Sequence, residues 1–113
     1  MKIMIATFAA SLAVLAAPLA EAYAYTEGGD VLISILVDEG CETAEWPTGA
    51  RNTKCGEYQT YQRNVEPGDV FGVRVHSESS WVGCSVTDVE SGEELVLKTA
   101  KAGGTANCML EAK

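Results

Sequence analysis

The residues with the clearest chemistry in this sequence are four cysteines, Cys41, Cys55, Cys84 and Cys108. No two of them form a Cys-x-x-Cys pair, and His76 is the only histidine, so the spacing does not favour zinc ligation. An even number of cysteines in a small exported chain is typical of disulfide bonds. The sequence therefore predicts two disulfides, no metal and no cofactor.

Four cysteines allow three pairings. The sequential pairing of Cys41 with Cys55 and of Cys84 with Cys108 closes the shortest loops and suits the expected strand order, so we favour it. In the chain-entropy model a loop of about 15 residues contributes roughly 3 kcal/mol, which is comparable with the stability of a small domain. The other two pairings stay open at this level.

Nucleophilic catalysis needs a nucleophile, a base and an orienting group, and His76 is the only available imidazole. It follows Arg74 on what the pattern predicts to be the polar face of a strand. No G-x-S-x-G motif is present, and a glycosidase cleft needs more scaffold than this chain supplies. We expect the protein not to be an enzyme.

Acidic residues gather around the first cysteine and offer oxygen ligands of the kind that calcium prefers: Asp38, Glu39, Glu42 and Glu45. Their spacing fits no EF-hand loop. The sequence therefore predicts a solvated acidic loop there.

The candidate partner-binding residues lie between Cys41 and Cys55, and they are Trp46, Pro47 and Arg51. An aromatic residue in a disulfide-tied loop is the kind of anchor that interfaces use. The alternative for Trp46, slightly favoured, is packing against one end of the core. Trp81 is expected in the core.

The elements that must position these residues are short strands. Alternating or β-rich runs predict strands over 31–37, 58–65, 70–76, 81–89, 95–99 and 106–110, with a loop over 41–56. The run over 58–65 is the more polar one and is expected near a sheet edge. Val31, Ile33, Ile35 and Val37 share one face of the first strand, and Leu32 and Leu36 indicate cover on the other.

Turn signals recur at sandwich-like intervals. The fold class predicted is all-β, a small antiparallel immunoglobulin-like β-sandwich stapled by two disulfides.

The N-terminus has the pattern of a secretory signal peptide. Lys2 precedes an uncharged apolar run over 3–17, and Ala20-Glu21-Ala22 fits a signal peptidase site. The run is shorter than the roughly 20 residues that span a bilayer, which disfavours the alternative of an uncleaved anchor. We predict a signal peptide over 1–22, with cleavage after Ala24 as the alternative, and one domain over 23–113. The mature protein is then secreted or in the cell envelope or periplasmic space, without stable membrane insertion.

The net charge of −8 limits the partners. Nucleic acids and anionic lipid surfaces attract basic proteins and repel acidic ones. We therefore expect no nucleic-acid partner.

From Tyr61 onward the order of features resembles the MmpS family, small mycobacterial accessory proteins that work with MmpL transporters in exporting siderophores and lipids. The matching stretches are Val65-Glu66-Pro67-Gly68-Asp69, Val73-Arg74-Val75, Val82-Gly83-Cys84-Ser85-Val86-Thr87-Asp88 and Ala106-Asn107-Cys108. Members of that family carry an N-terminal membrane anchor, whereas here a cleaved signal is predicted and the Cys41/Cys55 pair is an addition.

The resemblance implies an exported, non-enzymatic binding or accessory domain whose partner is a protein or an exported small molecule. The alternative is a secreted disulfide-tied inhibitor or effector that presents the 42–54 loop to a protein target.

Overall fold

The computed structural model describes residues 19–113, and most of the predicted signal peptide lies outside them. The described chain forms eleven strands and no helix. In chain order they are β1 (Ala20–Ala22), β2 (Gly29–Val37), β3 (Cys41–Glu45), β4 (Arg51–Cys55), β5 (Tyr58–Val65), β6 (Val70–Phe71), β7 (Arg74–His76), β8 (Val82–Asp88), β9 (Glu94–Ala100), β10 (Thr105–Asn107) and β11 (Leu110–Ala112).

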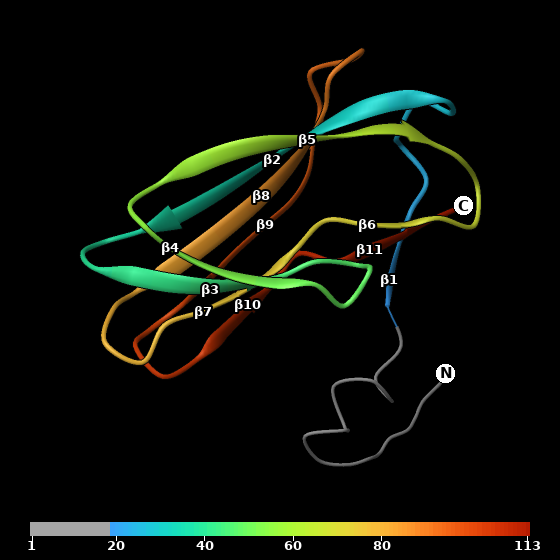
Figure 1. The fold of residues 1–113 in the computed structure, drawn as a ribbon. Coiled ribbons are helices and arrows are strands. Elements are labelled where there is room, and N and C mark those ends of the chain that lie inside the picture. Colours follow the sequence, from blue (N-terminus) through green and yellow to red (C-terminus); the bar gives the residue numbers. More distant parts are fainter. Residues whose placement is uncertain (1–18) are drawn as a thin grey trace.

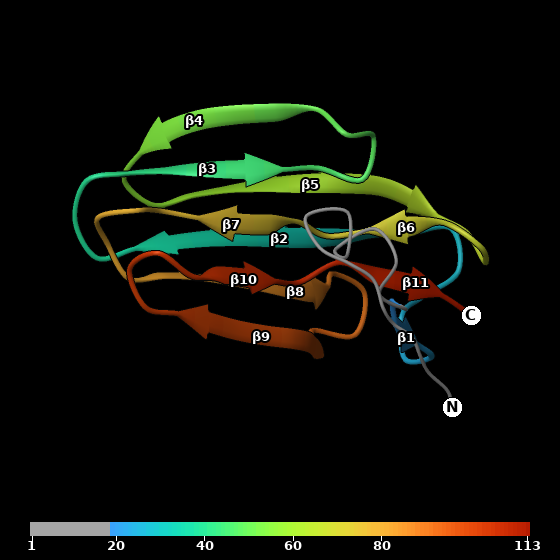
Figure 2. The ribbon, with the colours of Figure 1, turned by 90° about the horizontal axis from the view of Figure 1, so that it is seen from below.

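The strands form two layers (Figures 1 and 2). One layer is the antiparallel sheet β5-β2-β8-β9, and the other contains the antiparallel sheet β10-β7-β3-β4. The small sheet β1-β11-β6 continues the second layer, since β6 leads into β7 and β10 leads into β11. Among the described strands, only β1 with β11 is a parallel pair.

A glycine explains why two segments that the sequence predicts as continuous strands, 70–76 and 106–110, are each divided. At Gly72 φ is +112°, and a Cβ there would overlap the carbonyl oxygen of Cys108. Next to this close approach, the amide of Cys108 donates to the carbonyl of Val73 over 2.8 Å. The expected strands over 70–76 and 106–110 therefore exist, but each is interrupted where the two backbones approach.

The core lies where the alternation predicted it. Val31, Ile33, Ile35 and Val37 are at most 5% exposed. The inward residues of the other strands are equally buried: Phe71, Val73, Val75, Val82, Cys84, Val86, Ala106, Cys108 and Leu110. The predicted fold class, an antiparallel β-sandwich with two disulfides, is confirmed.

The loop predicted over 41–56 is wrong, because the segment is a β-hairpin. Strands β3 and β4 pair in register, with Cys41 opposite Cys55 and Glu45 opposite Arg51. Its inward positions carry few apolar side chains, so the alternation that marks a strand is hidden.

Two further expectations about burial are wrong. Trp81, placed in the core, is 40% exposed. Leu32 and Leu36 are only half-buried, so the outer face of β2 is not covered by another layer of the described chain. A run of apolar residues does not show by itself whether a second layer exists.

Both predicted disulfides are confirmed. Cys41–Cys55 joins neighbours within the hairpin, with Cα atoms 3.8 Å apart, whereas Cys84–Cys108 joins the two layers in the core over a Cα separation of 6.2 Å. Two disulfides indicate an oxidising, extracellular or periplasmic location.

Strand β1 contains the predicted cleavage motif. Ala22 is 6% exposed, and its carbonyl accepts a hydrogen bond from the amide of Lys113 over 3.0 Å. Within residues 19–113, no helix long and apolar enough to cross a membrane occurs.

Candidate functional site

A cleft of about 360 Å³ opens between the tip of the β3–β4 hairpin and strand β5. We call it the Trp46 cleft, and its lining consists of Ile33, Trp46, Pro47, Thr48, Thr60, Tyr61 and Gln62. The two layers thus contribute opposite walls, one from the hairpin tip and one from an edge strand.

The hairpin tip is a compact turn. The amide of Trp46 donates to the carbonyl of Ala50 over 2.9 Å, and the amide of Gly49 donates to the carbonyl of Trp46 over 2.8 Å. Gly49 has φ of +91°, a conformation that glycine adopts without a steric penalty. This turn holds Trp46 and Pro47 on the cleft side.

Trp46 is anchored before any ligand arrives. Its indole N–H donates to Oδ1 of Asn52 over 2.6 Å, and the ring is half-buried against the core. A ring already held in place loses little conformational entropy on binding. The two roles considered for Trp46, core packing and partner contact, are therefore compatible at one position.

The β5 wall follows from the pairing of β5 with β2. Thr60 and Gln62 lie opposite the buried residues Ile33 and Val31, so they face inward. The Gln62 side chain is fixed at both ends: its Nε2 donates to the carbonyl of Val70 over 3.2 Å, and its Oε1 accepts from the amide of Gly72 over 3.4 Å. This wall is polar but rigid.

Tyr61 forms the outer rim of the cleft and is 51% exposed. The guanidinium of Arg63 lies 4.7 Å from the centre of its ring, a cation–π contact. Because its neighbours Thr60 and Gln62 face inward, the Tyr61 ring lies on the outward side of β5, at the edge of the cleft.

Behind the hairpin lies a buried carboxyl group, Glu42, which is 2% exposed. Neither of its carboxylate oxygens has a hydrogen-bond partner within residues 19–113. Burial raises the pKa of Glu42, against the opposing effects of its own backbone amide and of the Lys54 charge. The solvated loop expected around Cys41 is thus correct for the exposed Asp38 and Glu39 but wrong for Glu42.

The structure brings together two of the three predicted partner-binding residues. Trp46 and Pro47 line the cleft, whereas Arg51 lies outside its lining, with its Nη2 3.9 Å from Oε2 of Glu45. Sequence reasoning missed the β5 wall. The available signal was the alternation in β5, where Thr60 and Gln62 occupy positions that an apolar residue fills in a closed core.

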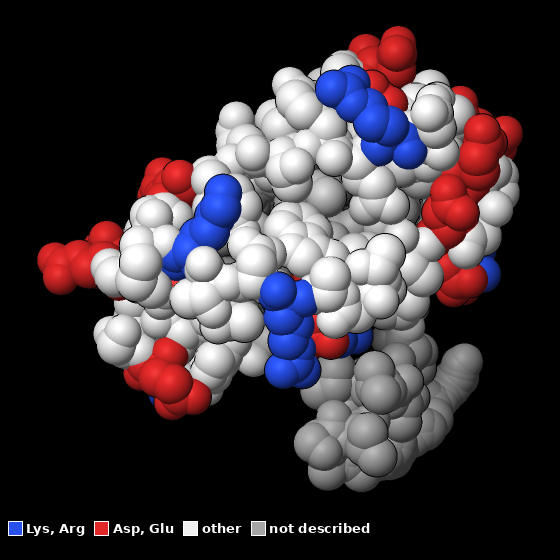
Figure 3. Space-filling view, in the orientation of Figure 1, with Lys and Arg blue, Asp and Glu red and all other residues white. Residues whose placement is uncertain are grey.

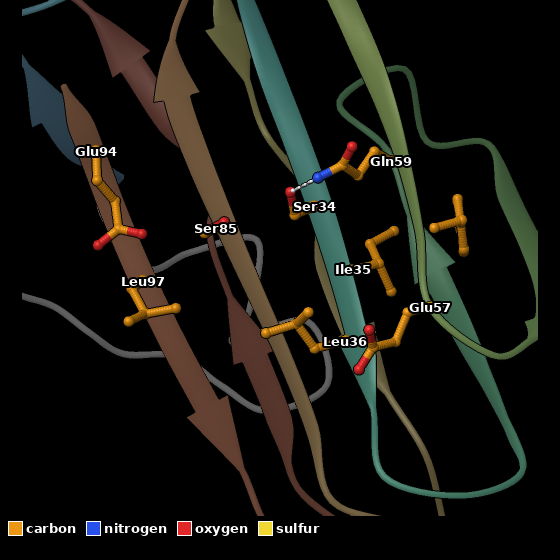
Figure 4. A pocket seen from close by; sticks show the side chains of 9 residues that line it. Ser34, Ile35, Leu36, Glu57, Gln59, Ser85, Glu94 and Leu97 are labelled. Atoms are coloured by element: carbon orange, nitrogen blue, oxygen red, sulfur yellow. Dashed lines mark hydrogen bonds between the residues drawn. The ribbon is translucent and has the colours of Figure 1, made fainter. Parts of the chain in front are cut away.

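A second hollow, of about 690 Å³, lies on the outer face of the sheet β5-β2-β8-β9 (Figure 4). Ser34 and Ser85 face each other across β2 and β8, and Nε2 of Gln59 donates to Oγ of Ser34 over 3.1 Å. Leu36 and Leu97 flank this row. The outward side chains of this hollow are small, polar or aliphatic, whereas the Trp46 cleft contains an indole ring fixed by a hydrogen bond.

The single histidine, His76, contacts three polar groups through its ring nitrogens. The hydroxyl of Thr105 is 3.4 Å from Nδ1, the carbonyl oxygen of Gly104 is closer, at 2.8 Å, and Nε2 is 2.7 Å from Glu78. Each ring nitrogen therefore has a hydrogen-bond acceptor nearby, and the hydroxyl is the more distant partner of Nδ1.

Within residues 19–113, no three His, Cys, Asp or Glu side chains lie close enough together to hold a metal ion.

A comparison of the chain with protein-family models, curated proteins and solved structures finds no match.

Proposed function

We propose that this chain is an exported, non-enzymatic binding domain whose ligand or partner engages the Trp46 cleft. The observation that carries the proposal is the cleft itself, in which an anchored Trp46 faces a rigid polar wall on β5. Pockets that combine aromatic side chains with a few fixed polar groups are typical of binding sites. The two disulfides fit a domain that works outside the reducing cytoplasm.

The accessory role that the MmpS resemblance implies is one form of this proposal. The ligand is then an exported siderophore or lipid, or the partner is an MmpL transporter. The apolar side of the cleft, formed by Ile33, Trp46 and Pro47, suits part of such a molecule.

The test fills the cleft without touching the core. Thr48 is exposed and lines the cleft, so Thr48→Trp is expected to block it, while Thr53→Trp on the same hairpin serves as the matched control. Tagged exported protein is purified from envelope and culture supernatant after cross-linking, and the attached molecules are compared by mass spectrometry. We expect one species to be retained by the wild type and by Thr53→Trp and lost from Thr48→Trp. Equal retention by all three would contradict the proposal.

The alternative, an inhibitor or effector that presents residues 42–54 to a protein target, also has a specific observation in its favour. The Cys41–Cys55 bridge closes the base of the hairpin, while Thr48, Gly49 and Ala50 at its tip are exposed. Recovery of the partner from the supernatant rather than the envelope would favour this form.

A further inference from the structure

We propose that the partner contributes an extended, acidic segment that pairs with the free edge of β5 and inserts one apolar side chain into the Trp46 cleft. This inference rests on the proposed function and names the kind of partner. It depends on three features of the same region: an open strand edge, a group of exposed cations and the position of the cleft.

The strand edge comes first. β5 is eight residues long and, among the described strands, has a neighbour, β2, on one side only. Such an edge is a template for another strand, and proteins usually protect it with proline, a bulge or several charges. β5 contains no proline, and its one charged residue is Arg63, which pairs with Asp30 over 2.7 Å. A bulge interrupts the pairing with β2 only at the C-terminal end of β5, beside Asn64, whose φ is +54°, so residues 58–62 form a regular strand with an open outer edge. Strand addition to an open edge is a common mode of peptide recognition.

The charge of this region differs from that of the whole molecule. Residues 51–65 contain Arg51, Lys54 and Arg63 against a single acid, Glu57. The acids that pair with Arg51 and Arg63 are Glu45 and Asp30, and they are only 27% and 28% exposed against 69% and 65% for the two arginines, so positive charge predominates at the surface here. Figure 3, viewed as Figure 1, shows blue side chains bordering a broad uncharged area, with red ones gathered mainly at the margins of this face. Opposite charges steer a partner and set its register.

This charge also decides against a second copy of the chain as the occupant. Two β5 edges brought together would place the two positive segments side by side, and like charges across an interface disfavour association. An acidic segment is attracted instead, because two cations are exposed on β4: Arg51 next to the hairpin tip and Lys54 near the hairpin base.

The cleft supplies specificity. Side chains of a strand alternate between the two faces of a sheet, so every second side chain of a strand added to β5 points inward, as Thr60 and Gln62 do. The inward space beyond β5 is the Trp46 cleft. One apolar side chain of the partner is thereby placed against Trp46, as in other strand-addition sites where pockets take alternate side chains.

The experiment uses the oxidised protein and a defined probe. The probe is an acetylated nonapeptide of alternating glutamate and threonine with a central phenylalanine. Its controls are the same peptide with lysine for glutamate, and the glutamate peptide N-methylated at alternate backbone nitrogens. Trp81→Phe leaves Trp46 as the single tryptophan, so its fluorescence reports on the cleft. Amide hydrogen exchange reports on pairing at β5.

We expect the glutamate peptide to bind at least ten-fold more tightly than the lysine peptide, to shift Trp46 emission and to protect amides of β5. N-methylation should abolish binding. Arg51→Gln/Lys54→Gln should weaken binding at least five-fold, whereas Lys98→Gln/Lys101→Gln, an exposed basic pair on and after β9, should not.

No binding, equal binding of the two charge forms, or binding unaffected by N-methylation would overturn the inference. The proposed function fails separately: it falls only if blocking the cleft with Thr48→Trp leaves the cross-linked species unchanged. Melting curves of every variant show that the fold is retained.

Discussion

Asp88 and Glu42 are both buried acids, but their surroundings give opposite effects on stability. Burial tends to raise the pKa of Asp88, but hydrogen bonds from Thr26 and Ser91 outweigh it, so that pKa is lowered. Each of these partners donates through both its backbone amide and its hydroxyl, over 2.8 to 3.0 Å. Glu42 has no such donors among the described residues, and its pKa is raised. The difference is one of hydrogen bonding rather than depth.

Asp88→Asn should destabilise the protein by about 2 kcal/mol at pH 7, because an amide oxygen replaces a charged acceptor that holds the N-terminal segment to the β8–β9 turn. A carboxyl with a lowered folded pKa stabilises above its unfolded value, near 3.8, and loses that contribution as pH falls through the folded pKa. Denaturant unfolding measured from pH 7 to pH 2 should therefore show a smaller decrease in the free energy of unfolding for the variant than for the wild type. Asp38→Asn, an exposed change, is the control; an equal effect there would contradict the assignment.

Glu42→Gln should have the opposite sign, stabilising the protein by about 1 kcal/mol at pH 7, because it removes a buried charge that lacks a hydrogen-bonded partner. The pKa of Glu42 is raised in the folded protein, so the wild type becomes protonated and regains stability as the pH falls through that pKa. The difference in stability between Glu42→Gln and the wild type should therefore shrink in acid. Chemical denaturation at pH 7 and pH 4 measures it, with the exposed Glu57→Gln as the control. A destabilised variant at pH 7 would show that Glu42 has a partner that stabilises its charge.

At the scale of elements, the two disulfides have different roles. Cys41–Cys55 reinforces two strands that already pair, whereas Cys84–Cys108 connects separate layers inside the core. The first closes the hairpin that presents Trp46, and the second holds the sandwich together.

Replacing Cys84 and Cys108 with alanine should destabilise the protein by about 4 kcal/mol, and the same change at Cys41 and Cys55 by less than about 3 kcal/mol. The inter-layer bridge spans the longer loop, 24 residues against 14, and its removal leaves space in the core. Unfolding monitored by circular dichroism compares the two. A larger loss at the hairpin bridge would contradict this ranking.

Strand β1 is the element whose presence depends on processing. Its last residue, Ala22, packs in the core, and the acid Glu21 lies 3.5 Å from Nζ of Lys113. Cleavage after Ala22, as the motif predicts, would remove all three residues of β1.

A chain that begins at Tyr23 should therefore melt at a temperature several degrees below one that begins at Leu19, because it loses the pairing with β11 and about 1 to 2 kcal/mol of stability. Glu21→Gln in the longer chain removes the ion pair but keeps strand β1, so it distinguishes the two contributions. It should lower the free energy of unfolding by less than about 1 kcal/mol, as loss of an exposed ion pair does. Identical melting of the two chains would show that β1 adds nothing to the folded domain.

At the scale of the whole molecule, the two disulfides and the N-terminal sequence pattern both favour the proposed export. N-terminal sequencing of the exported protein should give Tyr23, or Tyr25 for the alternative site, and peptide mapping without reduction should recover both bridges. An intact Met1 in the membrane fraction would contradict export by a cleaved signal and favour an anchor.

The sequence alone determined the features that local periodicity encodes. The inward faces of β2 and β8, the edge position of β5 and the pairing of the cysteines were all predictable, because alternation and loop length are read along the chain. The tertiary structure decided the rest. The hairpin around Trp46 pairs with β7 through its strand β3, and the cleft forms where the tip of that hairpin meets β5 of the other layer. Contacts between residues distant in sequence depend on how the two layers pack, which no local pattern specifies.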